Sequence, residues 1–473
     1  MVRDIAALEK LSIPAVGIFT SAFIQLAKGQ AIGAGMPDMR FAVVPHPVDG
    51  LPANVVQAKA QGIVDDIIKA LTCPPKDDQR ISADTAVGME VTVRIRGADP
   101  WDALEKMNRL FLHRGWSSGF PLVPPTREKV DWMLRGTDCA RNEVIGVMRP
   151  KGGQATVEKI AVNAVMAGCL PSYMPILITA VEAMTDPAFD MAQVAATAGT
   201  SAPLLIINGP IRNQLRVNYG TGALGTAWRA NATIGAAVRL ILANIGGALP
   251  GITDMSVIAW PGDFSLCMGE NEEANPWQPI HVEKGFDRQV NTVTAVAIYG
   301  MLDLMATTDR AEDVLGHYAT VITGSGSSHS IFQGTLLLLS PEPAALIASE
   351  GFSKQDVKEY LFNHVKLPFG KARVLATGGN GGKNAVGEQI KAGKALSDEL
   401  EINLLPCPDD VNIVVVGGAS MHTAWAQPGH GRLVTKAVTL PTNWDEIVQS
   451  DREAIDLSMP AWLRDSAPPA GQL

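Results

Sequence analysis

One stretch of the chain, residues 262–287, is dense in acidic and amide side chains and also carries a histidine. Glu270, Glu273 and His281 lie within it. A histidine held among carboxylates can act as an oriented general base, or it can join them in an oxygen and nitrogen site for a divalent metal. The stretch has no H-E-x-x-H zinc signature, and a solvated acidic loop is the alternative interpretation. Since a loop of this length is usually functional, we predict that His281 is catalytic.

The start of a predicted helix at 229–245 is a second candidate for ligand binding. Arg229 and Asn231 follow the glycine-rich segment Gly220–Thr226 there. The first turn of a helix exposes backbone N–H groups, and an arginine adds a forked donor that matches a carboxylate or phosphate. We therefore predict that Arg229 and Asn231 bind an anionic substrate. The alternative is an ion pair between Arg229 and a carboxylate of the acidic loop.

Polar and glycine residues also follow several predicted buried strands. In open parallel sheets, ligands bind at the carboxyl ends of the strands, where the loops diverge. Each such residue can equally be a turn former or a helix cap, but together they predict a shared site. The residues at these positions are His46, Asn208, Gly417, Gly418 and His422.

Two glycine-rich segments, 324–330 and 378–384, add small side chains and exposed amides. The first contains Ser328 and His329, which we predict to bind substrate and to transfer a proton, respectively. Neither segment fits the dinucleotide fingerprint G-x-G-x-x-G or the P-loop G-x-x-x-x-G-K-[ST]. The sequence thus has no NAD or ATP signature, and the cofactor stays unknown, with a divalent metal as the candidate.

The first 75 residues predict a small α/β unit that is incomplete. Two strand-length apolar runs, 13–20 and 41–45, alternate with helical segments, and this order implies parallel pairing. A two-stranded parallel sheet is marginal by itself. The strands that complete it are expected from later in the chain, from a partner subunit, or from sequence missing at the start.

The rest of the chain divides into three predicted segments: residues 76–135 as a linker, a strand and a helix, residues 136–310 as a central α/β domain that contains the acidic loop, and residues 311–473 as a C-terminal α/β domain. Buried strands are predicted at 203–208, 335–339 and 411–416, and an apolar helix at 291–305. The predicted fold class is α/β, with several parallel-sheet units around a shared cleft.

Composition excludes several classes of protein. The net charge of −9 argues against a nucleic-acid-binding surface, which needs clustered lysine and arginine. No apolar stretch is long enough to cross a bilayer, and no export signal is recognisable. The five cysteines are scattered without a C-x-x-C pair, so a disulfide framework is not expected. We expect a cytoplasmic protein.

The stretch DIAALEKLSIPAVGIFTSAF, followed by MPDMRFAVVPHPVDGLP, resembles the domain of the UGSC family of selenoproteins and their cysteine homologues. The longer members of that family resemble this chain further, at SGFPLVPPT, ATVEKIAVNAVMAG, NGPIR, RANATIG and the E-E-x-x-P-W…H-V-E-x-G-F loop. The matching residues of the first domain are Asp4, Leu8, Glu9, Lys10, Pro14, Pro45, His46 and Pro47.

The resemblance carries one departure. The family has a Sec/Cys-Gly-Ser-Cys loop that would lie just before Met1, and this sequence lacks it. Three explanations are open. A partner subunit carries the loop, or an upstream UGA codon was read as a stop, or the lineage has lost the loop. The family is described as related to the glycine, sarcosine and betaine reductases, which implies reductive cleavage of a carbon–heteroatom bond.

Three hypotheses for the function follow. The first is a subunit of an enzyme that acts on a small anionic metabolite, with His281, His329 or His46 moving a proton and a partner chain supplying a thiol or selenol. The second is a metal-dependent lyase or hydrolase that holds its ion with Glu270, Glu273 and His281. The third is a non-catalytic subunit that completes another protein.

Overall fold

The computed structural model describes residues 2–48, 51–73, 92–324, 335–376 and 397–457. The predictions for Ser328, His329 and the segment 378–384 lie outside these residues. Among the helices of the described residues, none combines the length and the apolar character needed to cross a membrane.

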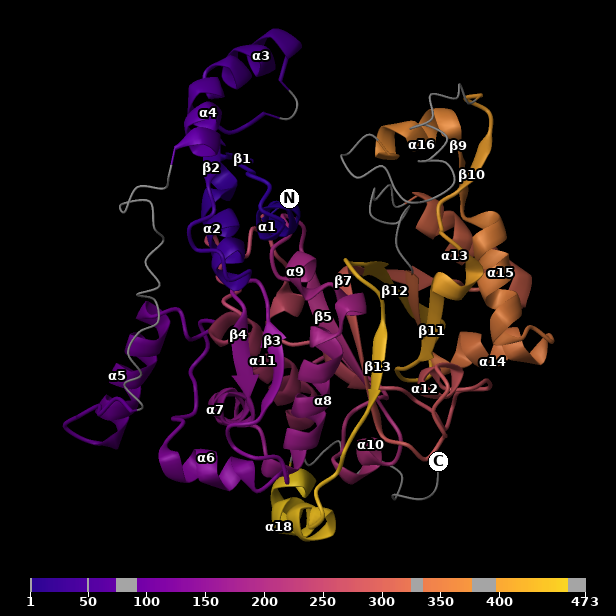
Figure 1. Cartoon of the computed structure of the whole chain (residues 1–473). Helices are drawn as coiled ribbons and strands as arrows, with labels where there is room; N and C mark the ends of the chain where they lie inside the picture. The colour runs from indigo at the N-terminus through magenta and orange to yellow at the C-terminus, as the bar shows by residue number, and fades with distance from the viewer. Residues whose placement is uncertain (1, 49–50, 74–91, 325–334, 377–396, 458–473) are drawn as a thin grey trace.

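The N-terminal unit is a two-stranded parallel sheet, as the sequence predicts (Figure 1). Its interior has two parts, one on each face of the sheet: Phe19 and Phe41 pack with α1 and α2, whereas Ala42 and Val44 pack with Ile63 at the start of α4. The elements are α1 Val2–Lys10, β1 Gly17–Thr20, α2 Ile24–Gly33, β2 Phe41–Val44, α3 Ala53–Gln61 and α4 Val64–Thr72.

Helices and a hairpin lead from this unit to the main body. Residues 92–96 form no regular strand, and α5 and α6 follow. The hairpin carries Arg149, whose guanidinium donates to the Gly33 carbonyl at 2.6 Å and so ties the main body to α2. The elements are α5 Pro100–His113, α6 Arg127–Leu134, β3 Val144–Met148, β4 Gly153–Thr156, α7 Val157–Ala167, α8 Met174–Thr185 and α9 Met191–Val194.

The main sheet has the order β11-β8-β12-β7-β5-β6, with β13 also paired to β7. The fold is α/β, as predicted, but the sheet is mixed rather than parallel: β5 and β6 are parallel, β8 and β11 are parallel, and the other pairs are antiparallel. Its strands are β5 Ala202–Asn208, β6 Cys267–Gly269, β7 Thr292–Met305, β8 Thr335–Leu339, β11 Val411–Val415, β12 His422–Pro428 and β13 Val434–Ala437.

The segment 291–305, predicted as an apolar helix, is the long strand β7. Its first half is buried on both faces, so it lacks the alternation that marks a half-exposed strand. Strands on both of its edges satisfy its backbone, and its Thr, Val and Ile residues favour extended chain. Tertiary pairing therefore overrides a local pattern that is ambiguous between helix and strand.

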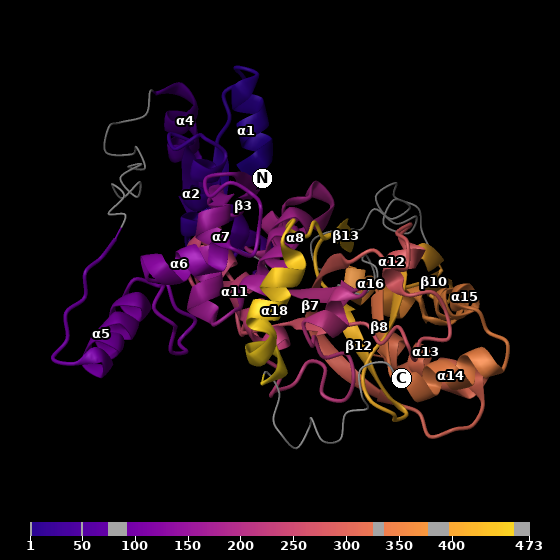
Figure 2. The ribbon, with the colours of Figure 1, turned by 90° about the horizontal axis from the view of Figure 1, so that it is seen from below.

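The sheet curls into a half-barrel whose strands come from both the 136–310 and the 311–473 segments. Side chains from six strands meet on its inner face, among them Leu204, Met268 and Leu336. Two helical groups cover the outer face, one built on α7, α8 and α11 and the other on α13 and α15 (Figures 1 and 2). The remaining helices and short strands are α10 Ile211–Gln214, α11 Arg229–Asn244, α12 Ile280–Glu283, α13 Ala311–Gly324, α14 Pro341–Ser349, α15 Lys354–His364, β9 Lys366–Pro368, α16 Phe369–Ala376, β10 Glu401–Asn403 and α18 Trp444–Asp456.

The acidic loop contains β6, one edge strand of this half-barrel, and it also contacts β11, the strand at the opposite edge. Directly after β6, the Asn271 amide donates to the Val415 carbonyl of β11 at 2.7 Å. Further along, Ile280 of α12 is fully buried in the inner core. The loop is thus packed into the fold rather than solvated, and it holds its polar residues at the ends of β5, β6 and β11.

Candidate functional site

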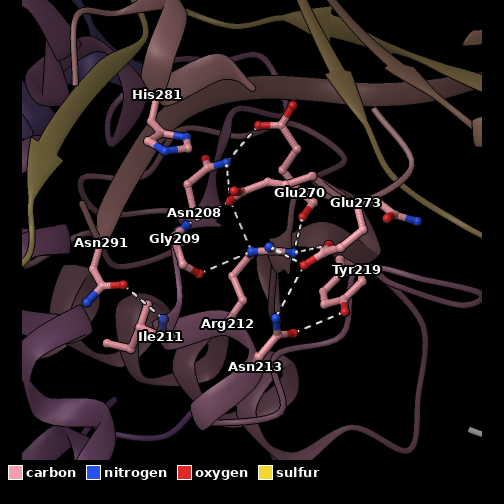
Figure 3. Close-up of polar contacts among 12 residues, drawn as sticks. Asn208, Gly209, Ile211, Arg212, Asn213, Tyr219, Glu270, Glu273, His281 and Asn291 are labelled. Atoms are coloured by element: carbon pink, nitrogen blue, oxygen red, sulfur yellow. Dashed lines mark hydrogen bonds and ion pairs between the residues drawn. The ribbon is translucent and has the colours of Figure 1, made fainter. Parts of the chain in front are cut away.

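The site begins where β5 ends. Asn208, the last residue of β5, is fully buried, and Gly209 turns the chain immediately afterwards. Gly209 has a φ of +85°, and a Cβ there would lie 2.6 Å from the Val290 carbonyl oxygen, so the turn requires glycine. The turn leads into α10 and brings the Arg212 side chain back beside Asn208 (Figure 3).

The acidic loop meets these residues through two of its carboxylates. The Asn208 amide nitrogen donates to Glu270 Oε2 at 2.7 Å and to Glu272 Oε1 at 3.1 Å. The backbone N–H of Gly209 also donates to Glu272 Oε1, at 2.7 Å. Because the Asn208 nitrogen faces two carboxylates, its oxygen must be the atom that points the other way.

Arg212 supplies the positive charge of this cluster, and only 3% of the residue is exposed. Its Nε lies 3.0 Å from Glu272 Oε1, and its two terminal nitrogens lie 3.1 and 2.9 Å from Glu273. The Tyr219 ring stacks on the guanidinium at 4.6 Å. Two carboxylates therefore already neutralise Arg212, which makes it a structural cation rather than a free anion-binding group.

Two acids of this cluster, Glu270 and Glu273, have pKa values shifted in opposite directions. Burial raises the pKa of Glu270, although hydrogen bonds from Asn208 and from the Ile280 amide at 2.8 Å oppose that rise. Burial alone would also raise the pKa of Glu273, but the hydrogen bonds and charge of Arg212 outweigh it and hold the pKa below its ordinary value. Environments that separate the pKa values of neighbouring acids are characteristic of acid–base sites.

His281 of α12 lies next to this network and is fully buried. Its Nε2 is 3.3 Å from the Arg288 carbonyl oxygen, so Nε2 carries the ring proton and Nδ1 is an acceptor. Burial lowers the pKa of His281 even though the Glu272 charge opposes this, which favours the neutral imidazole. Nδ1 has no hydrogen-bond partner within the described structure, and neither has Asn208 Oδ1.

Several predicted site residues therefore come together: Asn208, Glu270, Glu273 and His281. The Gly417 and Gly418 turn lies close by, because the Gly417 amide donates to the Tyr219 carbonyl at 2.8 Å. Sequence reasoning missed Arg212 and Tyr219 as members of the cluster, whereas Glu272 belongs to the acidic loop that it singled out. For Arg212, the available signal was its place in NGPIR, directly after a buried strand that ends in a polar residue.

Arg229 and Asn231 serve the scaffold instead. The Arg229 guanidinium donates to the Gly168 carbonyl at 3.2 and 3.0 Å, beyond the last turn of α7. The Asn231 amide bonds the backbone at Asn218 and Cys267, at 2.8 to 3.0 Å. In this arrangement the predicted substrate-binding groups hold the loops around the site, because buried backbone groups at helix ends and loops must find partners.

His46 and His422 lie apart from the cluster. His46 contacts Thr20 and Phe23 within the N-terminal unit, with its Nδ1 3.0 Å from the Thr20 hydroxyl. His422 begins β12, and its Nδ1 lies 2.8 Å from Asp303 Oδ2 in an exposed pair. The structure thus does not join either histidine to His281.

The structure does not support the predicted metal set of Glu270, Glu273 and His281. No group of three or more metal-ligating side chains with suitable geometry occurs in the described parts of the chain. Glu273 is committed to Arg212, and His281 directs its protonated nitrogen at a carbonyl. Of the three side chains, His281 keeps an unpaired nitrogen at Nδ1, but one such atom does not make a metal site.

The two buried thiols, Cys169 and Cys267, are not set up as nucleophiles. All five cysteines are free of disulfides. Burial raises the pKa of Cys169 to about 12 and also raises the pKa of Cys267. Because the thiolate is the reactive form, these two thiols are inert at neutral pH.

The comparisons with known proteins concern the N-terminal unit. The model of the UGSC family matches residues 1–73, which comprise both strands of the parallel sheet and the helices around it. Residues 1–73 are thus similar to the UGSC family. The UGSC segment contains His46, whereas the polar cluster around Asn208 lies outside the match. No curated protein and no solved structure matches the chain.

Proposed function

We propose that the chain is a subunit of an enzyme that transfers protons to a small anionic metabolite at the Asn208–His281 cluster. The observation that carries this proposal is the pair of buried acceptors, Asn208 Oδ1 and His281 Nδ1, both without a partner in the described structure. Buried polar atoms are almost always satisfied, so two unsatisfied acceptors in one buried cluster favour a ligand that brings a hydroxyl or amine donor.

In this proposal His281 and Glu270 divide the proton transfer. The neutral imidazole accepts a proton at Nδ1, and the high pKa of Glu270 keeps a proton available in the same cluster. The Gly418 turn supports the anionic character of the metabolite, because no described acceptor takes its backbone N–H. Arg229 has no part in binding, since it is occupied at Gly168.

A partner chain supplies the redox group. Reductive cleavage of a carbon–heteroatom bond needs two electrons and two protons. A dithiol or selenol–thiol pair supplies both when it is oxidised to a disulfide or selenenylsulfide. The carbon gains one hydrogen in place of the broken bond, and the heteroatom leaves with the other proton. The raised pKa values of Cys169 and Cys267 favour an external source for these electrons. The free cysteines are also consistent with a reducing compartment, and we place the protein in the cytoplasm.

The N-terminal unit is the proposed docking site for that partner. Its parallel sheet has two strands with open edges, and Ile18 and Val43 on those strands are 44% and 40% exposed. On α4, Val64, Ile68 and Leu71 are also exposed, although the helix is strongly amphipathic. Additional strands from a partner would cover this surface and stabilise the sheet.

The experiment combines the chain with a protein that carries a Sec/Cys-Gly-Ser-Cys loop and offers glycine, sarcosine and betaine as probes, whose carboxylate represents the anionic group of the metabolite. We expect release of ammonia, methylamine or trimethylamine from one of them, and only when both proteins are present. His281→Gln should lower kcat about 100-fold while KM stays close to the wild-type value. His364→Gln, an exposed histidine on α15, is the matched control.

Two results would contradict the proposal. If none of the three amines is released, the reductive reaction is wrong. If His281→Gln turns over like His364→Gln, the cluster is not catalytic, and a non-catalytic subunit becomes the better interpretation of the exposed apolar surface.

A further inference from the structure

A separate cavity of about 200 Å³ opens inside the curl of the main sheet. Its walls come from the middle of β7, the start of β8 and the segment that joins β12 to β13. None of its lining residues belongs to the Asn208–His281 cluster. A volume below the ~300–1,000 Å³ of drug-sized sites suits a small metabolite.

One part of the cavity is apolar. Ile298 of β7 and Leu336 of β8 belong to the inner core of the half-barrel and also line the cavity, together with Leu433. These side chains offer an aliphatic surface to whatever occupies the space. A ligand that fills it therefore needs an apolar portion.

The polar part of the lining carries charges of both signs. Lys284 and Arg432 are its cations, and Asp409 and Asp410 are its carboxylates. Neither cation forms an ion pair with another residue in the described regions of the chain. Partial burial lowers the pKa of Lys284, and the charges of Glu283 and of Asp410 oppose this shift, although the residue is exposed at the mouth of the cavity.

Asn412 adds an unsatisfied acceptor to the same lining. Its amide nitrogen donates to the Thr335 and Asp410 carbonyls at 3.4 and 3.3 Å, whereas its Oδ1 is buried and accepts from no described donor. An acceptor beside two carboxylates provides the environment that an ammonium group requires.

We propose that this cavity binds a small zwitterion with an aliphatic chain, such as an aliphatic amino acid. Lys284 and Arg432 bind its carboxylate, and Asp409, Asp410 and Asn412 Oδ1 bind its ammonium group. Ile298, Leu336 and Leu433 pack against the chain. The inference does not depend on the reaction proposed above, because it concerns binding at other residues.

The test is calorimetric titration of the full chain with norvaline, pentanoate and butylamine, which share similar aliphatic chains. We expect norvaline to bind, and both single-charge probes to bind about tenfold more weakly or not at all. Arg432→Gln and Asp409→Asn should each weaken norvaline binding by about tenfold. Arg310→Gln, which removes an exposed arginine on another surface, should leave it unchanged.

Each contrary result is decisive, provided that circular dichroism shows the variants to be folded. Equal binding of pentanoate and norvaline would mean an anion site and would overturn the role of the carboxylates. No binding of norvaline, or unchanged binding by Arg432→Gln, would overturn the site itself. Loss of the enzymatic reaction with intact norvaline binding would reject only the function proposed above.

Discussion

Asn208 Oδ1 and His281 Nδ1 are both buried acceptors without a partner in the described structure, and Figure 3 shows both side chains in the same polar cluster. Their other atoms explain why. The Asn208 amide nitrogen donates to Glu270 and Glu272, and His281 Nε2 donates to the Arg288 carbonyl. The surrounding groups thus fix the orientation of both side chains before any ligand arrives, which is the arrangement expected of a preorganised site.

The tautomer of His281 is the first prediction. Because Nε2 faces a carbonyl oxygen and burial lowers the pKa of His281, the ring should be the neutral Nε2–H form at pH 7. Nitrogen-15 NMR of the histidine ring distinguishes the tautomers directly. A protonated Nδ1 at pH 7 would contradict the assignment of this atom as an acceptor.

Glu270 should make stability depend on pH. Its pKa is raised above the ordinary value of 4.5, so the folded state retains the proton longer than the unfolded state does. The resulting stabilisation is complete below pH 4.5 and is lost as the pH rises through the folded-state pKa. Glu270→Gln should remove this dependence of the free energy of unfolding on pH, which urea unfolding between pH 4.5 and 8 measures. Parallel curves for the wild type and the variant would show that Glu270 is ionised in the fold.

Asn208→Asp should destabilise the protein at neutral pH by about 3 kcal/mol, because it places a new carboxylate against Glu272 and removes the donor that Glu270 and Glu272 share. The loss should shrink at pH 5, where the introduced carboxylate begins to protonate. Urea unfolding at the two pH values provides the comparison. A loss that does not change with pH would point to lost packing instead of charge repulsion.

Arg212→Ala should lower the free energy of unfolding by about 3–5 kcal/mol, since Glu272 and Glu273 would remain without their counter-ion. Arg212→Lys should restore only part of this, because an ammonium group cannot reproduce the forked contacts. The control is Arg310→Ala, whose ion pair is exposed on both sides and should cost less than about 1 kcal/mol. If Arg212→Ala and Arg310→Ala lower the free energy of unfolding by similar amounts, the buried network around Arg212 contributes little to stability.

Arg229→Ala should affect stability rather than substrate binding. The change removes two charged hydrogen bonds to Gly168, which are worth about 1.5–3 kcal/mol, and leaves that carbonyl without this donor. Thermal unfolding measures the loss. An increase in KM without loss of stability would restore Arg229 to the substrate-binding role that the sequence suggests.

Local patterns in the sequence determined the parallel pair of the N-terminal unit, the strand 202–208 with its polar end, the helix at 229–244, and the acidic loop as the source of His281. Each of these depends on interactions between residues near one another in the chain, and hydrophobic periodicity reports such interactions. The same local patterns identified Asn208, Glu270 and His281 as candidate site residues.

Tertiary structure alone decided which of those residues meet. Arg229 and Arg212 both follow a glycine turn, and each binds a group 61 positions away in the sequence. Arg229 donates to the Gly168 carbonyl, whereas Arg212 forms an ion pair with Glu273. The strand at 292–305 is a strand because β5 and β12 pair with it, and the same curl of the sheet brings β6 to β11. Partners for buried polar groups come from any part of the chain, so their choice depends on the packed fold rather than on local sequence.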